Sequence, residues 1–134
     1  MPNDARSGST PTPNRELAPA RVLVVEDNSI IALDTQEILL GLGVAHVDVA
    51  GATAAALALI DRACPEFALL DFNLGGETSE PVAQALEERA IPFAFATGYG
   101  DLDEQTGDYR QRVAVLLKPY SKDDLANVLR QRAA

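Results

Sequence analysis

Residues 22–27 read Val-Leu-Val-Val-Glu-Asp, a short apolar run that ends in two acids. Four consecutive apolar residues without alternation are typical of a strand that is buried on both faces, as in a parallel sheet. Such a strand would place the carboxylates of Glu26 and Asp27 at its carboxyl end. The same arrangement of an apolar strand ending in a polar residue recurs along the chain.

Four further segments are predicted as strands. They cover residues 46–50, 67–70, 92–96 and 113–117. Asp71 follows the third strand, Thr97 the fourth and Lys118 the fifth. The apolar continuity of the first, third and fifth strands favours burial of all three.

Segments with helical spacing of apolar residues lie between these strands and after the last one. The predicted caps and first residues are Asn28 or Ser29, Thr53, Ser79 with Pro81, and Ser121 with Asp124. The alternation predicts a doubly wound α/β fold with a five-stranded parallel sheet covered on both faces. Right-handed crossovers would bring all carboxyl ends to one edge, where ligand sites of such folds form.

The chain has 134 residues, which suits one domain. We assign residues 21–132 to this domain and read residues 1–20, rich in proline and polar residues, as a flexible tail. Residues 98–112 are rich in glycine and acids, so a fourth helix there should be short, displaced or mobile. No apolar run is long enough to cross a bilayer, and we expect a soluble, cytoplasmic protein without membrane contact.

The formal net charge of −9 disfavours direct binding of nucleic acid, which requires a basic surface. Cys64 is the only cysteine, so the chain has no internal disulfide.

The predicted edge gathers three carboxylates, a hydroxyl and an ammonium. Each close carboxylate pair would cost roughly a few kcal/mol at an effective dielectric constant near 20. Hard oxygen ligands suit Mg²⁺, and Lys118 adds a second positive charge. The alternative is that each residue is a polar strand end with its own local partner. A purely structural Mg²⁺ or Ca²⁺ site would leave Lys118 and Thr97 without a role.

These residues resemble the receiver domain of two-component response regulators over residues 21–132. The resemblance rests on the acid pair after the first strand, the apolar run closing on Asp71, Ala96-Thr97-Gly98, and Leu117-Lys118-Pro119. The stretch Pro-Phe-Ala-Phe-Ala-Thr-Gly-Tyr at residues 92–99 further resembles the FAT GUY subgroup. Members of that subgroup are often single-domain proteins of alphaproteobacteria that work with kinases of the HWE and related classes.

The resemblance implies the CheY-like, or flavodoxin-like, strand order 2-1-3-4-5. It implies that Asp71 is the phosphoacceptor, and that Thr97 and Lys118 contact the phosphoryl oxygens. Mg²⁺, or Mn²⁺ in its place, would be held by Glu26, Asp27, Asp71 and the backbone carbonyl of Asn73. Pro119 would follow a cis peptide bond, with an ordinary trans proline as the alternative.

One position departs from the family pattern. Many receivers carry an aromatic residue on the fifth strand three places before the lysine, and this chain has Val115 there. The aromatic residue of the usual coupling with threonine is therefore absent from the predicted fifth strand. Two hypotheses involve Tyr99, which would replace that coupling or shield the acyl phosphate from water. Asn73 and Tyr99 are expected to modulate the lifetime of the phosphoryl group.

The predicted function is a switch that accepts a phosphoryl group from a sensor histidine kinase or a phosphotransfer protein. Such a protein catalyses only its own modification and slow hydrolysis, so it is not an enzyme in the wider sense. Output would pass through contact of residues 98–132 with a downstream protein, or through competition for phosphoryl groups. The first alternative is a phosphorylation-independent scaffold that retained the pocket. The second, a haloacid-dehalogenase-like phosphatase, requires an acid where Asn73 stands.

Overall fold

A computed structural model describes residues 18–98 and 113–131, which form five strands and four helices. In chain order the elements are β1 (Arg21–Val25), α2 (Ser29–Gly41), β2 (His46–Ala50), α3 (Thr53–Arg62), β3 (Phe67–Asp71), α4 (Glu80–Glu88), β4 (Phe93–Thr97), β5 (Ala114–Leu117) and α5 (Lys122–Gln131). The predicted tail over residues 1–17, Tyr99 and most of the predicted fourth-helix segment lie outside the described residues.

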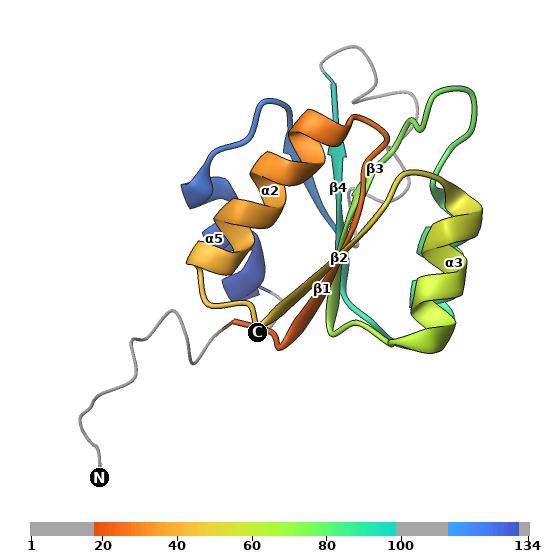
Figure 1. Ribbon diagram of the computed structural model, residues 1–134, viewed down its shortest axis with the longest axis horizontal. Coiled ribbons are helices and arrows are strands. Elements are labelled where there is room, and N and C mark those ends of the chain that lie inside the picture. The colour runs from red at the N-terminus through yellow and green to blue at the C-terminus, as the bar shows by residue number, and fades with distance from the viewer. Residues whose placement is uncertain (1–17, 99–112, 132–134) are drawn as a thin grey trace, which may run out of the picture.

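The strands form one parallel sheet in the order β2-β1-β3-β4-β5, which confirms the predicted fold. Figure 1 shows the sheet between two helical layers, with α2 and α5 together on one face and α3 on the other. Because all strands run in the same direction, their carboxyl ends lie along one edge.

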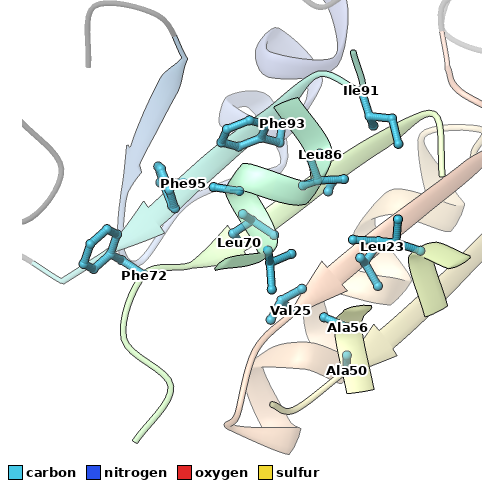
Figure 2. Packing of buried hydrophobic residues seen from close by; sticks show 14 of the residues in the cluster. Leu23, Val25, Ala50, Ala56, Leu70, Phe72, Leu86, Ile91, Phe93 and Phe95 are labelled. Atoms are coloured by element: carbon cyan, nitrogen blue, oxygen red, sulfur yellow. The ribbon is translucent and has the colours of Figure 1, made fainter. Parts of the chain in front are cut away.

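The core consists of two apolar clusters, one on each face of the sheet. Alternate residues of β1 divide between them: Leu23 and Val25 face α3 and α4, whereas Val22 and Val24 face α2 and α5. In the first cluster, the ring of Phe95 lies edge-on to Phe72 and Phe93, at centroid distances of 5.2 and 5.6 Å (Figure 2). These contacts fix the central strands, and thereby the positions of the residues that follow them.

Strand burial differs from the prediction at β5. The strands β1 and β3 are buried, as predicted, but most of β5 is only half-buried and Leu117 is exposed. Within the described residues, β5 lies at the sheet edge and pairs with β4 alone. By contrast, β4, which lies next to β5 in the sheet, is fully buried.

Two of the four predicted helix starts have the expected side-chain cap. Asn28 accepts hydrogen bonds from the backbone of Ile30 and Ile31, and Ser121 and Asp124 form a reciprocal capping box. Ser79 stands at the N-cap of α4, but its side chain makes no capping bond and Pro81 is the second helical residue.

The prediction that Thr53 caps a helix was wrong. Thr53 is the first residue of α3, and its hydroxyl donates to the carbonyl of Thr78. The carboxylate of Glu77 accepts from the backbone N–H of Thr53 at 3.3 Å, which satisfies one free donor of this helix end. A cap that comes from 24 residues away leaves no local sequence signal.

Candidate functional site

The carboxyl ends of β1 and β3 bring three acids together. Glu26 and Asp27 directly follow β1, Asp71 is the last residue of β3, and the two strands are neighbours. One carboxylate oxygen from each residue lies within 4.8 Å of the others. Glu26 and Asp71 are buried, at 4% and 7% exposure. The sequence rule that parallel strands end at one edge thus placed all three acids in one pocket.

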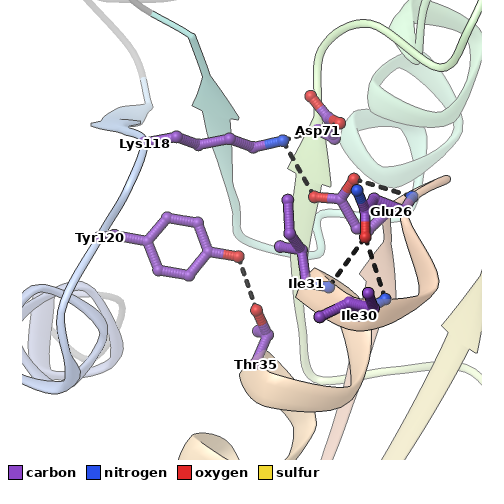
Figure 3. Close-up of polar contacts among 8 residues, drawn as sticks. Glu26, Ile30, Ile31, Thr35, Asp71, Lys118 and Tyr120 are labelled. Atoms are coloured by element: carbon purple, nitrogen blue, oxygen red, sulfur yellow. Dashed lines mark hydrogen bonds and ion pairs between the residues drawn. The ribbon is translucent and has the colours of Figure 1, made fainter.

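Lys118 reaches this pocket from the end of β5. Its ammonium nitrogen Nζ lies 2.9 Å from Oδ2 of Asp71 and 3.0 Å from Oε1 of Glu26 (Figure 3). Its backbone N–H donates to the carbonyl of Thr97 at 2.9 Å, which extends the pairing of β5 with β4 by one residue. The peptide bond between Lys118 and Pro119 is cis.

The pocket carries more negative than positive formal charge. Burial raises the pKa of Glu26, and the neighbouring Asp71 raises it further. The hydrogen bonds from Lys118 and from the backbone of Asn28 lower this pKa, but the net shift is upward. For Lys118, burial lowers the pKa, but hydrogen bonds to Asp71 and Glu26 outweigh it, so the pKa lies above its ordinary value. Lys118 therefore keeps its charge at neutral pH, while three ionised carboxylates would leave two negative charges uncompensated.

Thr97 ends β4 beside β3 and has an unsatisfied hydroxyl. The residue is buried, and its Oγ1 has no hydrogen-bond partner within the part of the chain that the structure describes. A buried hydroxyl without a partner costs free energy, so its presence at a strand end beside the acids points to a ligand that accepts its hydrogen bond.

The loop after β3 packs against Asp27. Asn73 pairs with Thr78 in an isolated antiparallel bridge, and Gly75 has a φ of +63°. A Cβ atom on Gly75 would lie 3.1 Å from Oδ2 of Asp27, so a side chain there would crowd this carboxylate. Asn73, two residues after Asp71 in sequence, therefore belongs to a loop that approaches the carboxylate of Asp27 at Gly75.

One contact beside the pocket was missed by the sequence analysis. The hydroxyl of Tyr120 lies 2.7 Å from Oγ1 of Thr35, which joins the segment after Lys118 to α2 (Figure 3). A signal was present, because Thr35 falls on the buried face of its helix and a buried hydroxyl needs a partner. Val115, noted above for the missing aromatic residue, packs against the cluster on the α3 side of the sheet.

The donor set fits a hard divalent cation. Three carboxylates offer oxygen ligands at close quarters, and their excess negative charge equals the charge of one such ion. Receiver domains bind Mg²⁺ through acidic residues of this kind.

The parallel sheet and the acid pocket with its lysine define a CheY-like α/β domain, and the comparisons with known proteins agree. No family model matches the chain. SdrG from Sphingomonas melonis Fr1, whose solution structure is known, is 40% identical, with 87% of this chain and 98% of that one covered and a TM-score of 0.76. The chain belongs to the receiver domains of response regulators.

Two further relatives extend this picture. The transcriptional regulatory protein PdtaR from Mycobacterium tuberculosis is 29% identical over 119 residues, which cover 86% of this chain and 58% of PdtaR. The chain thus spans little more than half of that relative. The receiver domain of the PhyR response regulator from Erythrobacter litoralis shares the fold, with a TM-score of 0.76 at 20% identity over 88% of this chain and 92% of that one. Among the described residues, none of the helices has the length and apolar character needed to cross a membrane.

Proposed function

We propose that Asp71 accepts a phosphoryl group in a reaction that depends on a divalent cation, and that the protein signals through this modification. The observation that carries the proposal is the position of Asp71, which shares a pocket with Glu26 and Asp27 and contacts the ammonium of Lys118 at 2.9 Å. The unsatisfied hydroxyl of Thr97 gives independent support, because a phosphoryl oxygen would accept its hydrogen bond.

The chemistry is a transfer between two groups. A carboxylate oxygen of Asp71 attacks phosphorus, the new O–P bond forms, and the bond from phosphorus to the donor breaks, with its electron pair leaving on the donor. Lys118 stabilises the negative charge on the equatorial oxygens. Glu26, Asp27, Asp71 and the backbone carbonyl of Asn73 would hold Mg²⁺ or Mn²⁺, which supplies further positive charge to those oxygens when bound.

The donor in the proposed function is a phosphorylated histidine of a kinase or phosphotransfer protein. Membership of the FAT GUY subgroup, with a kinase of the HWE class, stays a prediction from residues 92–99. Output would come from phosphorylation-dependent contact with a second protein or from competition for phosphoryl groups. The modulator Tyr99 and residues 99–112 of the predicted docking face over residues 98–132 lie outside the described residues, whereas residues 113–131 of that face are described.

The proposal is tested by incubating the protein with a small phosphodonor and Mg²⁺ and recording its intact mass. The wild type should gain one phosphoryl group, and Asp71→Asn should gain none because the amide cannot act as the nucleophile. Asp61→Asn is the matched control, since Asp61 lies on α3 and pairs with Arg89 on the surface. This variant should match the wild type.

Removal of divalent ions with a chelator should prevent the mass gain, and added Mg²⁺ should restore it. Uptake by Asp71→Asn, or none by the wild type under any condition, would contradict the proposal. A partner that binds wild type and Asp71→Asn equally, whether or not phosphodonor is present, would instead support the scaffold.

A further inference from the structure

The segment that follows β5 is tied by two side-chain contacts to the residue after β1 and to α2. The ammonium of Lys118 lies 3.0 Å from Oε1 of Glu26, 92 residues away. The hydroxyl of Tyr120 lies 2.7 Å from Oγ1 of Thr35, 85 residues away. Both ties are visible in Figure 3, where Lys118 and Tyr120 extend from the same segment toward Glu26 and α2.

These two ties are linked through α2 into a closed ring. The backbone N–H of Asn28 donates to Oε2 of Glu26 at 3.2 Å. The side chain of Asn28 caps α2, and α2 carries Thr35 on its second turn. Movement of Tyr120 away from Thr35 would therefore shift Lys118 relative to Glu26, because the same rigid helix start holds both partners.

Lys118 needs such support because its own strand constrains it weakly. β5 has four residues, lies at the sheet edge within the described part of the chain, and is only half-buried over most of its length. The bond from the N–H of Lys118 to Thr97 is followed by Pro119, which has no N–H to donate. A lysine side chain has four rotatable bonds, so a fixed Nζ position depends on a fixed backbone.

The Tyr120–Thr35 bond is suited to this role by its burial. Thr35 is 1% exposed, and the ring of Tyr120 packs against the apolar cluster between the sheet and the helices α2 and α5. Loss of either hydroxyl would leave the other without its partner in a partly buried place, which costs more than loss of an exposed bond. Burial also raises the pKa of Tyr120, so the phenol stays protonated at neutral pH.

We propose that the Tyr120–Thr35 hydrogen bond positions Lys118, and thereby sets how fast Asp71 takes up a phosphoryl group. Tyr120 is then a positioning residue that acts through Lys118 and does not contact the reacting atoms. The inference rests on the proposed function for its effect on rate, but the bond itself orders the pocket in the unmodified protein.

The test is the rate constant of phosphoryl uptake from a small phosphodonor at saturating Mg²⁺. Tyr120→Phe and Thr35→Val each remove one hydroxyl and keep the shape, and each should slow uptake about five-fold. The double variant should be no slower than either single variant, because both changes break the same bond. Thr35→Ser keeps the hydroxyl and should react within about two-fold of the wild type.

Ile60→Val serves as the control for a purely structural effect. Ile60 is buried on α3, on the opposite face of the sheet, so this variant should lose stability without losing rate. If Tyr120→Phe reacts at the wild-type rate, or if the two single effects add in the double variant, the positioning role is wrong.

A second readout needs no phosphoryl uptake. In metal-free protein, the amide NMR signals of Glu26 and Asp27 should shift in both Tyr120→Phe and Thr35→Val, and should stay in place in Ile60→Val. Wild type that takes up no phosphoryl group would contradict the proposed function alone, because these shifts still report on the Tyr120–Thr35 hydrogen bond. Unchanged amide signals in both variants would overturn the inference whatever the wild type does.

Discussion

Tyr120 holds an ionisable group between the apolar core and the charged pocket. Burial raises its pKa above the ordinary value of 10.0, the bond with Thr35 lowers it, and the charge of Glu26 raises it again. The folded protein thus favours the neutral phenol. This contribution to stability is fully present below pH 10.0, the ordinary value, and is lost as pH rises through the higher pKa of the folded state.

We therefore expect the tyrosinate absorbance of Tyr120, obtained as wild type minus Tyr120→Phe, to titrate with a midpoint above pH 10.0. Across the same range, the free energy of unfolding should fall more steeply in the wild type than in Tyr120→Phe. A midpoint at or below 10.0 would mean that the phenol is solvated rather than buried.

Residue positions in the pocket were predictable where the chain itself determines them. A side chain that follows a parallel strand must lie at the carboxyl edge, so Glu26, Asp71 and Lys118 could be grouped from the sequence. The partner of each side chain was not predictable. The position of Lys118 between Asp71 and Glu26, and the bond of Tyr120 to Thr35, depend on the angle between β5 and α2, which no local pattern encodes.

At the level of elements, the start of α2 connects the pocket to the fold. Oδ1 of Asn28 accepts from the N–H groups of Ile30 and Ile31 at 3.0 and 3.1 Å, and its own N–H donates to Glu26. Asn28 therefore satisfies two free backbone N–H groups at the start of α2. Its own N–H also holds the carboxylate of Glu26 in place.

Asn28→Ala should lower the free energy of unfolding by about 1 kcal/mol, the usual cost of losing a side-chain cap. Urea unfolding followed by circular dichroism measures this loss. Asn127→Ala is the control, because Asn127 is exposed within α5 and the change should stay within about 0.5 kcal/mol. Equal losses in the two variants would show that the cap contributes nothing.

Element types and most bounds followed from the sequence, but two features of the elements did not. Thr53 resembled a cap because threonine before an apolar helix is a common signal. The structure uses Glu77 there instead, since the loop after β3 lies against the start of α3. The partial exposure of β5 was equally hidden, because an apolar run has the same composition at the edge of a sheet as at its centre.

For the molecule as a whole, stability depends on the two clusters that hold helices on either face of the sheet. Ile60 is 2% exposed and belongs to the cluster on the α3 and α4 side. Ile60→Val should cost about 0.5–1.5 kcal/mol, measured by urea unfolding. Leu33→Ala, at a side chain that is 57% exposed on α2, should stay within about 0.5 kcal/mol. A loss at Leu33 as large as that at Ile60 would contradict this account of the core.

The arrangement of layers was predictable at this scale because few topologies satisfy alternating strands and helices with right-handed crossovers. Which residues of each helix are most deeply buried was less so. On α2, the large side chains of Ile31 and Ile38 are half-buried, while the small Ala32 is fully buried. The small side chain of Ala32 lets the helix approach the sheet, a choice set by packing across the layers rather than by the period of the sequence.

The pocket draws Glu26 and Lys118 from positions 92 residues apart, and this separation bears on the order of events during synthesis. A nascent chain emerging from the ribosome presents β1 and β3 early, but the ammonium arrives only when residue 118 has been translated. On the proposed function, an unfinished chain would carry the acceptor aspartate without the group that makes it reactive. On that proposal, only chains that have been translated beyond β5 would accept a phosphoryl group. Kinases would then not transfer phosphoryl groups to incomplete chains.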